Sequence, residues 1–138
     1  MAHTQALHRN ANAVYRLVYH LVLVTKYRKK VLTGAMLDRA SAILSGLCEA
    51  WGGRLLACSG EDDHLHALLD LPPKVRPADI INNLKTVTSR RLRDEFPILR
   101  SAYRGKPVLW SPSYCIISAG GAPIEILRQY VENQKRPD

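Results

Sequence analysis

The stretch EDDHLHALLDLPP, residues 61–73, places two histidines on either side of one leucine at the start of a short apolar run. Successive side chains of a β-strand point to opposite faces, so His64 and His66 share one face. Two imidazoles side by side are a suitable pair of metal ligands and an unusual way to fill a core. The alternate positions face a core on the other side, namely Leu65, Ala67, Leu69 and Leu71.

Three further strands are predicted from the spacing of apolar residues. Residues 14–27 alternate as one long strand, in which His20 lies on the partly open face near the candidate site. Residues 54–59 form a second strand, joined to the histidine strand by a tight turn. Residues 107–118 form a last strand that we expect to be interrupted near Pro112.

Three helices are predicted between and after these strands. Apolar residues recur at three- and four-residue spacing over residues 36–51, and Gly52-Gly53 ends that helix. A second helix begins at Pro77 and ends before Pro97. A last helix starts around Pro123 and runs to the C-terminus.

The order of elements indicates the fold class. Strand, helix, strand, strand, helix, strand predicts a ferredoxin-like, RRM-like α+β fold, an antiparallel sheet with two helices on one face. The C-terminal helix is extra and is expected to cover the open face. Residues 1–13 are expected to be a flexible leader, and residues 14–138 a single domain.

Composition indicates the kind of partner. The 20 Lys and Arg residues exceed the 12 Asp and Glu residues, and the net charge of +8 favours a polyanion such as nucleic acid. We expect a cytoplasmic protein without membrane contact. The three cysteines are too widely spaced for a disulfide framework, and the sequence shows neither a signal peptide nor an apolar run long enough to span a membrane. No Gly-rich phosphate loop is present, so no nucleotide cofactor is expected.

The terminal helix carries a second candidate constellation. Tyr130 and Gln134 are four residues apart, so they lie on one side of the helix, next to its apolar stripe. Two imidazoles and one carboxamide oxygen form a three-ligand set with open positions for substrate oxygens. Mg²⁺ prefers oxygen ligands, whereas Mn²⁺ accepts imidazole more readily, so the sequence leaves the divalent metal ion open between them.

Four ordered motifs resemble one family. HLH after a short turn, WSPSY before the last strand, YVENQ in the terminal helix and YHLVLVTKYR near the start resemble the single-tyrosine (Y1) transposases of IS200/IS605 insertion sequences, which are HUH endonucleases. The resemblance covers nearly the whole chain. One departure is local, because Asp62 stands where a proline is expected before the Asp63-His64 pair.

The resemblance implies a function and the roles of individual residues. Tyr130 would be the nucleophile and His64, His66 and Gln134 the metal ligands. The implied reaction is cleavage and rejoining of single-stranded DNA at insertion-sequence ends through a 5′-phosphotyrosine, in a homodimer that binds DNA hairpins in a bacterial or archaeal cytoplasm. The resemblance leaves open whether Tyr130 completes its own histidine pair or that of a partner.

Two other functions and the role of the basic residues stay open. The chain could be a domesticated tyrosine transposase acting on repetitive extragenic palindromes, or a non-catalytic nucleic-acid-binding module. Basic residues on the first turn and the second helix are candidates for phosphate contacts, although ordinary solvated faces look the same. These candidates are Lys26, Arg28, Lys29, Lys30, Lys85, Arg90 and Arg93.

Overall fold

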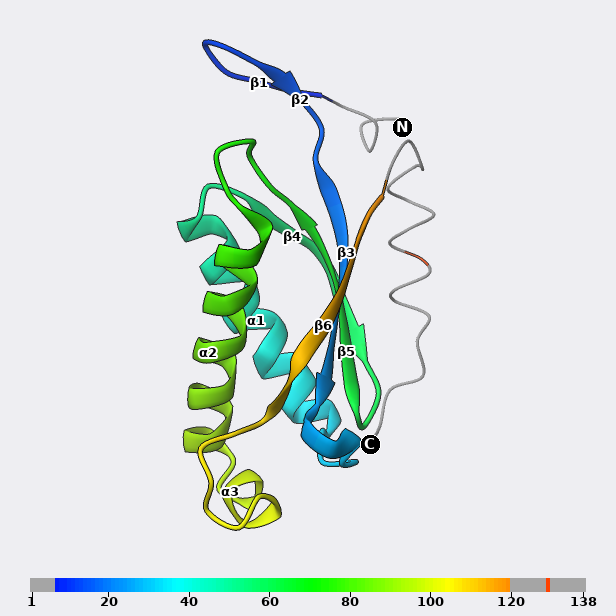
Figure 1. The fold of residues 1–138 in the computed structure, drawn as a ribbon, viewed down its shortest axis with the longest axis vertical. Helices are drawn as coiled ribbons and strands as arrows, with labels where there is room; N and C mark the ends of the chain where they lie inside the picture. The colour runs from blue at the N-terminus through cyan, green and yellow to red at the C-terminus, as the bar shows by residue number, and fades with distance from the viewer. Residues whose placement is uncertain (1–6, 120–128, 130–138) are drawn as a thin grey trace.

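The computed structural model describes residues 7–119 and residue 129, and its main feature is a four-stranded antiparallel sheet with two long helices on one face (Figure 1). The order across the sheet is β4-β5-β3-β6, the ferredoxin-like order that the sequence predicted. The predicted C-terminal helix lies outside the described residues. The elements are β1 (His8–Arg9), β2 (Val14–Tyr15), β3 (Val18–Thr25), the 3₁₀ turn η2 (Lys26–Arg28), α1 (Gly34–Ala50), β4 (Arg54–Gly60), β5 (His64–Asp70), α2 (Pro77–Glu95), α3 (Ile98–Ala102) and β6 (Trp110–Ser118).

The strand β5 lies inside the sheet, between β3 and β4, and its side chains alternate as predicted. Leu65, Ala67 and Leu69 are fully buried in the main core beneath the helices. Leu68 points to the opposite face and is also buried, in a small second cluster with Val18. The open face of the sheet is therefore apolar at its centre and polar where the histidines stand.

The helix α1 covers the sheet through the stripe that the sequence predicted. Thr33 caps its N-terminus, because the Thr33 hydroxyl accepts a hydrogen bond from the Met36 N–H at 3.2 Å. The helix ends where Gly52 adopts a φ of +85°, which a residue with a side chain rarely adopts. Its buried side chains are Met36, Leu37, Ala40, Ile43, Leu44 and Cys48.

The helix α2 begins at Pro77 and ends at Glu95, two residues before Pro97, as expected. Ile80, Ile81 and Leu84 are fully buried against α1 and the sheet. The short helix α3 follows directly and was not predicted, because one turn of helix has too few residues to show a period.

The first predicted strand is divided in two. Residues 14–15 pair with His8–Arg9 as a small hairpin, and the sheet strand β3 begins only at Val18. Part of the segment expected as a leader therefore has a defined conformation. The His8 ring anchors it, since His8 Nε2 lies 2.6 Å from Asp70 Oδ2 at the end of β5.

The strand β6 spans Pro112, and its pairing with β3 is interrupted there, as predicted. Proline cannot donate a backbone hydrogen bond, but β6 is the outermost strand of its sheet, where one side of the strand has no partner strand. Leu23 pairs with Tyr114 and Thr25 with Trp110, so the register shifts opposite residues 111–113. The interruption is thus a local break in the pairing, and the strand continues past it because edge strands tolerate proline.

Candidate active site

His64 and His66 stand side by side on the open face of the sheet. They are the first and third residues of β5, and their neighbours across the ladder with β3 are Val24 and Val22. The two ring centroids are 4.8 Å apart and the ring planes meet at 75°. The structure thus brings together the two residues that their spacing predicted to share a face.

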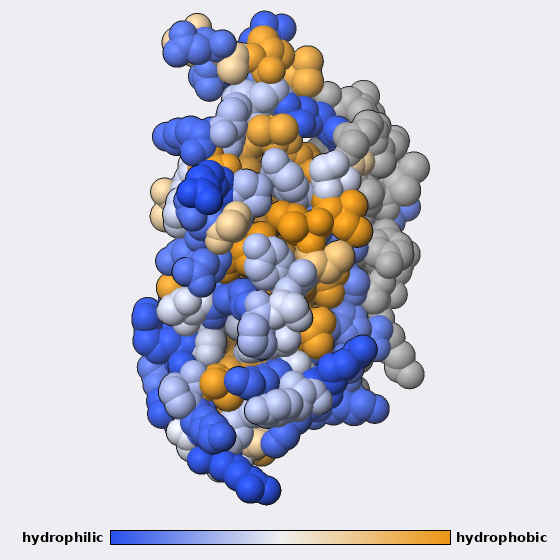
Figure 2. Space-filling view, in the orientation of Figure 1, coloured by the Kyte–Doolittle hydropathy of each residue, from blue (hydrophilic) through white to orange (hydrophobic). Residues whose placement is uncertain are grey.

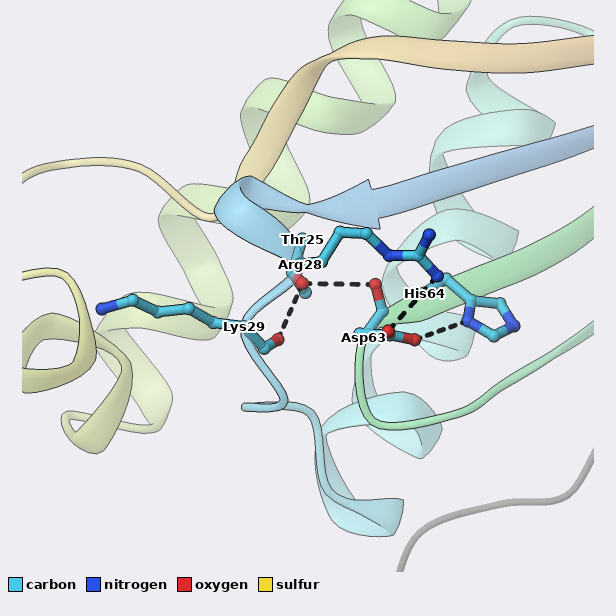
Figure 3. A network of polar contacts seen from close by, with 5 residues as sticks. All are labelled: Thr25, Arg28, Lys29, Asp63 and His64. Carbon is cyan, nitrogen blue, oxygen red and sulfur yellow. Dashed lines mark hydrogen bonds and ion pairs between the residues drawn. The ribbon is translucent and has the colours of Figure 1, made fainter.

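The Asp63 carboxylate fixes the orientation of His64 (Figure 3). His64 Nδ1 lies 2.8 Å from Asp63 Oδ1, and Arg28 Nη2 lies 3.5 Å from Asp63 Oδ2. The hydrogen bond with His64 is the main cause that lowers the pKa of the Asp63 carboxyl. An ionised carboxylate only accepts, so Nδ1 donates and the lone pair of a neutral His64 ring stands on Nε2.

The loop that carries Asp63 is tied to the end of β3. The Thr25 N–H donates to the Asp63 carbonyl oxygen at 2.9 Å, and the Thr25 hydroxyl donates to the Lys29 carbonyl oxygen at 2.7 Å. Thr25 is fully buried, so these bonds form away from solvent, where an unmade one would be costly. This buried threonine therefore fastens the turn after β3 to the residue that orients His64 (Figure 3).

His66 is held by a third histidine. His20 Nε2 on β3 lies 2.9 Å from His66 Nδ1, and the two rings are stacked with centroids 5.1 Å apart. Burial, then the charges of His64 and His20, lowers the pKa of His66 to about 4. Burial also lowers the pKa of His20. The lowered pKa of His66 favours its neutral form at pH 7, and when His66 Nδ1 is the donor its lone pair stands on Nε2.

The donor chemistry of the pair suits a divalent metal ion. A metal-binding histidine normally donates its other ring N–H to a carboxylate or another acceptor, and Asp63 and His20 supply such partners. Within residues 7–119 and 129, no three His, Cys, Asp or Glu side chains are grouped to hold a metal ion. The predicted third ligand, Gln134, and the predicted nucleophile, Tyr130, lie outside the described residues.

The basic candidates fall into two separate groups. Lys26, Arg28, Lys29 and Lys30 follow β3 at the end of the sheet that carries His64, and Arg28 joins the network of Asp63. The other three are on α2, which covers the face opposite to the histidine pair (Figure 1). There Lys85 donates to the Pro112 carbonyl, Arg93 donates to Ser89, and Arg90 is exposed.

One contributor to the site, Asp63, was not predicted from the sequence, although a carboxylate next to a histidine is a usable signal. His20 was expected near the site, but its bond to His66 depends on the register between β3 and β5. Asp70, on the same face of β5, bonds to His8 at the other end of the strand.

The family of the chain follows from comparison with known proteins. A family model described as "Transposase IS200 like" matches residues 13–134. The ISDra2 transposase TnpA of Deinococcus radiodurans is 33% identical over 121 residues, which cover 88% of this chain and 86% of the relative. The transposase of insertion sequence IS200 from Salmonella typhimurium is 31% identical over 120 residues, 87% of this chain and 78% of the relative.

Solved structures agree with this relationship. A Deinococcus radiodurans R1 protein described as a transposase superposes with a TM-score of 0.75 at 33% identity, over 94% of this chain and 98% of the other. A REP-associated tyrosine transposase bound to a REP hairpin shares the fold, with a TM-score of 0.57 at 10% identity. The superposition covers 91% of this chain and 68% of the other. The chain belongs to the IS200-like transposase family, which confirms the resemblance seen in its motifs. None of the described helices has the length and apolar character needed to cross a membrane.

Proposed function

We propose that this transposase cuts and rejoins single-stranded DNA at insertion-sequence ends, with Tyr130 as the nucleophile. The observation that carries the proposal is the pair His64 and His66, whose Nδ1 atoms are each held by a polar neighbour on an open sheet face. Such an arrangement suits ligands of a metal ion more than a stacking platform for bases, which would present aromatic rings. It favours an enzyme over a non-catalytic binding module.

The metal site would consist of His64, His66 and Gln134, with Mg²⁺ or Mn²⁺ as the ion. When bound, a divalent ion polarises a phosphodiester and neutralises charge that develops during its cleavage. Asp63 and His20 hold the two imidazoles in a fixed orientation, as metal ligands require. Two of the three ligands are thus preorganised by their neighbours.

The reaction itself would be a transesterification. The phenol oxygen of Tyr130 attacks the phosphorus, and the bond from phosphorus to the 3′-oxygen breaks. The phenol loses one proton and the leaving 3′-oxygen gains one, which makes it a 3′-hydroxyl. The product is a 5′-phosphotyrosine, and the reverse reaction with another 3′-hydroxyl rejoins DNA without ATP. Because tyrosine has a pKa of ~10 in water, it requires activation at neutral pH.

The partner would be single-stranded DNA with hairpins near the element ends, bound by a homodimer. The net charge of +8 supports a polyanionic partner. A tyrosine transposase of the same fold has been solved with a REP hairpin, which is compatible with hairpin binding here. The basic turn at residues 26–30 is the group of cations next to the histidine pair.

The decisive experiment is detection of the covalent intermediate. The protein is incubated with labelled single-stranded DNA carrying varied hairpins, with Mg²⁺ or Mn²⁺, and separated on a denaturing gel. We expect a protein–DNA adduct that mass spectrometry maps to Tyr130 and that disappears with a chelator. Tyr130→Phe removes the nucleophilic oxygen and should abolish the adduct, whereas Tyr114→Phe, at an exposed tyrosine, should retain it.

Two other outcomes would each decide against part of the proposal. An adduct at a residue other than Tyr130 would keep the reaction class and remove the assigned nucleophile. DNA binding without an adduct, across all hairpins and both metal ions, would favour a non-catalytic binding module.

A further inference from the structure

A cationic groove lies between the turn η2, which follows β3, and the segment that follows α3. It has a volume of about 290 Å³, and its lining residues include four cations and, among the described residues, no carboxylate. Figure 2 shows that the surface at the α3 end of the molecule is mostly hydrophilic. The polar residues that line the groove are Lys26, Tyr27, Lys29, Tyr103, Arg104 and Lys106.

The floor of the groove is held by contacts between two segments far apart in the chain. The Tyr103 ring is buried, and its hydroxyl donates to the Lys26 carbonyl oxygen at 2.9 Å, which ties the segment after α3 to the turn after β3. Lys29 Nζ lies 5.1 Å from the Tyr103 ring centroid and also donates to the Ala102 carbonyl oxygen. Two segments far apart in the chain therefore form one preorganised surface.

Tyr27 stands at the rim of this groove in an unusual conformation. Its residue is 74% exposed, although aromatic rings are normally buried at least in part. Its backbone has a φ of 61°, and Arg28 follows with a φ of 52°. This left-handed region is disfavoured for residues with a side chain, and such strain persists only where the surroundings enforce it.

Folding alone gives no reason to present a strained, exposed ring among cations. The Lys26 N–H bonds to the Leu109 carbonyl at 2.8 Å, so the backbone on one side of Tyr27 is fixed. Within residues 7–119, the ring has the ammonium of Lys26 as a partner, 5.6 Å from the ring centroid. A flat, exposed aromatic face beside several cations is the combination with which proteins bind unpaired nucleotides.

We propose that this groove binds one unpaired nucleotide of the single-stranded DNA, with its base stacked on Tyr27 and its flanking phosphates on Arg104 and Lys106. The inference rests on the proposed function and adds a binding site to it. A base within a duplex is already stacked and paired, so its face is not available to Tyr27. The groove therefore selects single-stranded DNA over duplex.

One short turn connects the groove with the histidine pair, because it carries residues that line the groove and one that contacts Asp63, the partner of His64. Lys29 and Arg28 project from that turn in opposite directions, Lys29 toward α3 and Arg28 toward Asp63 and His64 (Figure 3). A strand held on Tyr27 would thus continue past Arg28 toward the candidate active site. The groove would position the segment next to the bond that is cut.

The test measures binding of the full chain to single-stranded oligonucleotides in the presence of a chelator, so that no cleavage occurs. Fluorescence anisotropy gives the affinity, and 2-aminopurine placed at successive positions reports stacking of one base. We expect Tyr27→Ala and Tyr27→Gly to weaken binding about tenfold and to remove the stacking signal, whereas Tyr27→Trp retains both. Glycine adopts the left-handed φ without strain, so loss of binding in that variant does not arise from misfolding.

The phosphate contacts have a separate readout. Arg104→Ala and Lys106→Ala should each reduce the slope of log affinity against log salt by about 0.7, the value for one phosphate contact on a single strand. Arg76→Ala, an exposed arginine at the start of α2, should leave that slope unchanged. Tyr114→Ala is the matched aromatic control, because Tyr114 is also an exposed tyrosine with a lysine over its ring.

The outcomes separate this inference from the proposed function. Unchanged binding by Tyr27→Gly would overturn the nucleotide site even if Tyr130 forms its adduct, and so would an equal loss with Tyr114→Ala. If Arg104→Ala weakens DNA binding and Tyr27→Gly does not, the nucleotide site is also overturned, in favour of a phosphate contact alone. If Tyr27→Gly weakens DNA binding but the wild-type protein forms no Tyr130 adduct, the nucleotide site stands and the proposed DNA cleavage is rejected.

Discussion

At the scale of single residues, the candidate site depends on two side chains that need not touch DNA. Asp63 and His20 each bond to the Nδ1 atom of one member of the histidine pair. Such contacts select the tautomer and the orientation of a ring, and thereby the nitrogen that faces a ligand. The chemistry of His64 and His66 is therefore set partly by neighbours from a loop and from another strand.

We expect His20→Ala to lower Mn²⁺ affinity by about 10- to 100-fold, because His66 loses the partner that orients its ring. His20→Gln should recover part of the affinity, since its carboxamide oxygen can accept from His66 Nδ1. Calorimetric titration of the protein with Mn²⁺ measures both. The control is His8→Ala, which removes a histidine at the opposite end of the sheet, and equal affinities for His20→Ala and His8→Ala would contradict the role of His20.

At the scale of secondary-structure elements, α2 is joined to the edge strand β6 by buried and exposed polar contacts. The Trp110 indole N–H donates to the Thr88 hydroxyl oxygen at 2.9 Å, and Thr88 is fully buried. Lys85 donates to the Pro112 carbonyl oxygen at 3.0 Å on the exposed side. These bonds join β6 to α2 near Pro112, the residue of the strand that donates no backbone hydrogen bond.

Thr88→Val should destabilise the protein by about 1–3 kcal/mol, because it keeps the side-chain shape and leaves the buried Trp110 N–H without its acceptor. Urea unfolding monitored by circular dichroism measures the change. The matched control is Thr86→Val, an exposed threonine on the same helix, which should change stability by less than about 0.5 kcal/mol.

A double-mutant cycle distinguishes the bond from a packing effect. In the Trp110→Phe background the indole N–H is already absent, so Thr88→Val should cost less than it does in the wild type. Equal costs in the two backgrounds would show that the hydrogen bond does not contribute.

At the scale of the whole molecule, stability and exposure are unevenly distributed. The main core lies between the sheet and the helices α1 and α2, and β5 is buried on both faces. The hairpin of β1 and β2 has two residues in each strand and projects from the end of the sheet away from η2 (Figure 1). Short strands with few contacts open easily, whereas central strands open only on global unfolding.

His8→Ala should therefore speed amide hydrogen exchange over residues 8–15 without changing exchange over residues 65–69. The His8 ring is the side chain that connects the hairpin to Asp70, and the Asp70 carboxylate is nearly buried. Peptide-resolved mass spectrometry measures both segments in one experiment. Faster exchange over residues 65–69 as well would show that the hairpin belongs to the cooperative core.

Much of the fold could be predicted because its signals are local. The alternation of side chains in β5 and the apolar stripes of α1 and α2 follow from burial of one face of each element. Each pattern can be recognised from the residues of that element alone. The interruption near Pro112 was predicted from proline's missing N–H, and the structure shows it as a register shift between β6 and β3. The hairpin at residues 8–15 was missed because its anchor, Asp70, is 62 residues from His8.

The family, the two-layer fold and the shared face of His64 and His66 could all be predicted before folding, because motif order and side-chain parity are properties of neighbouring residues. The groups that surround the histidine pair could not be predicted in this way, because distant segments bring them there. His20 meets His66 across 46 residues, and Tyr103 meets Lys26 across 77. Those contacts depend on strand register and on the path of a loop, which arise from packing of the whole chain.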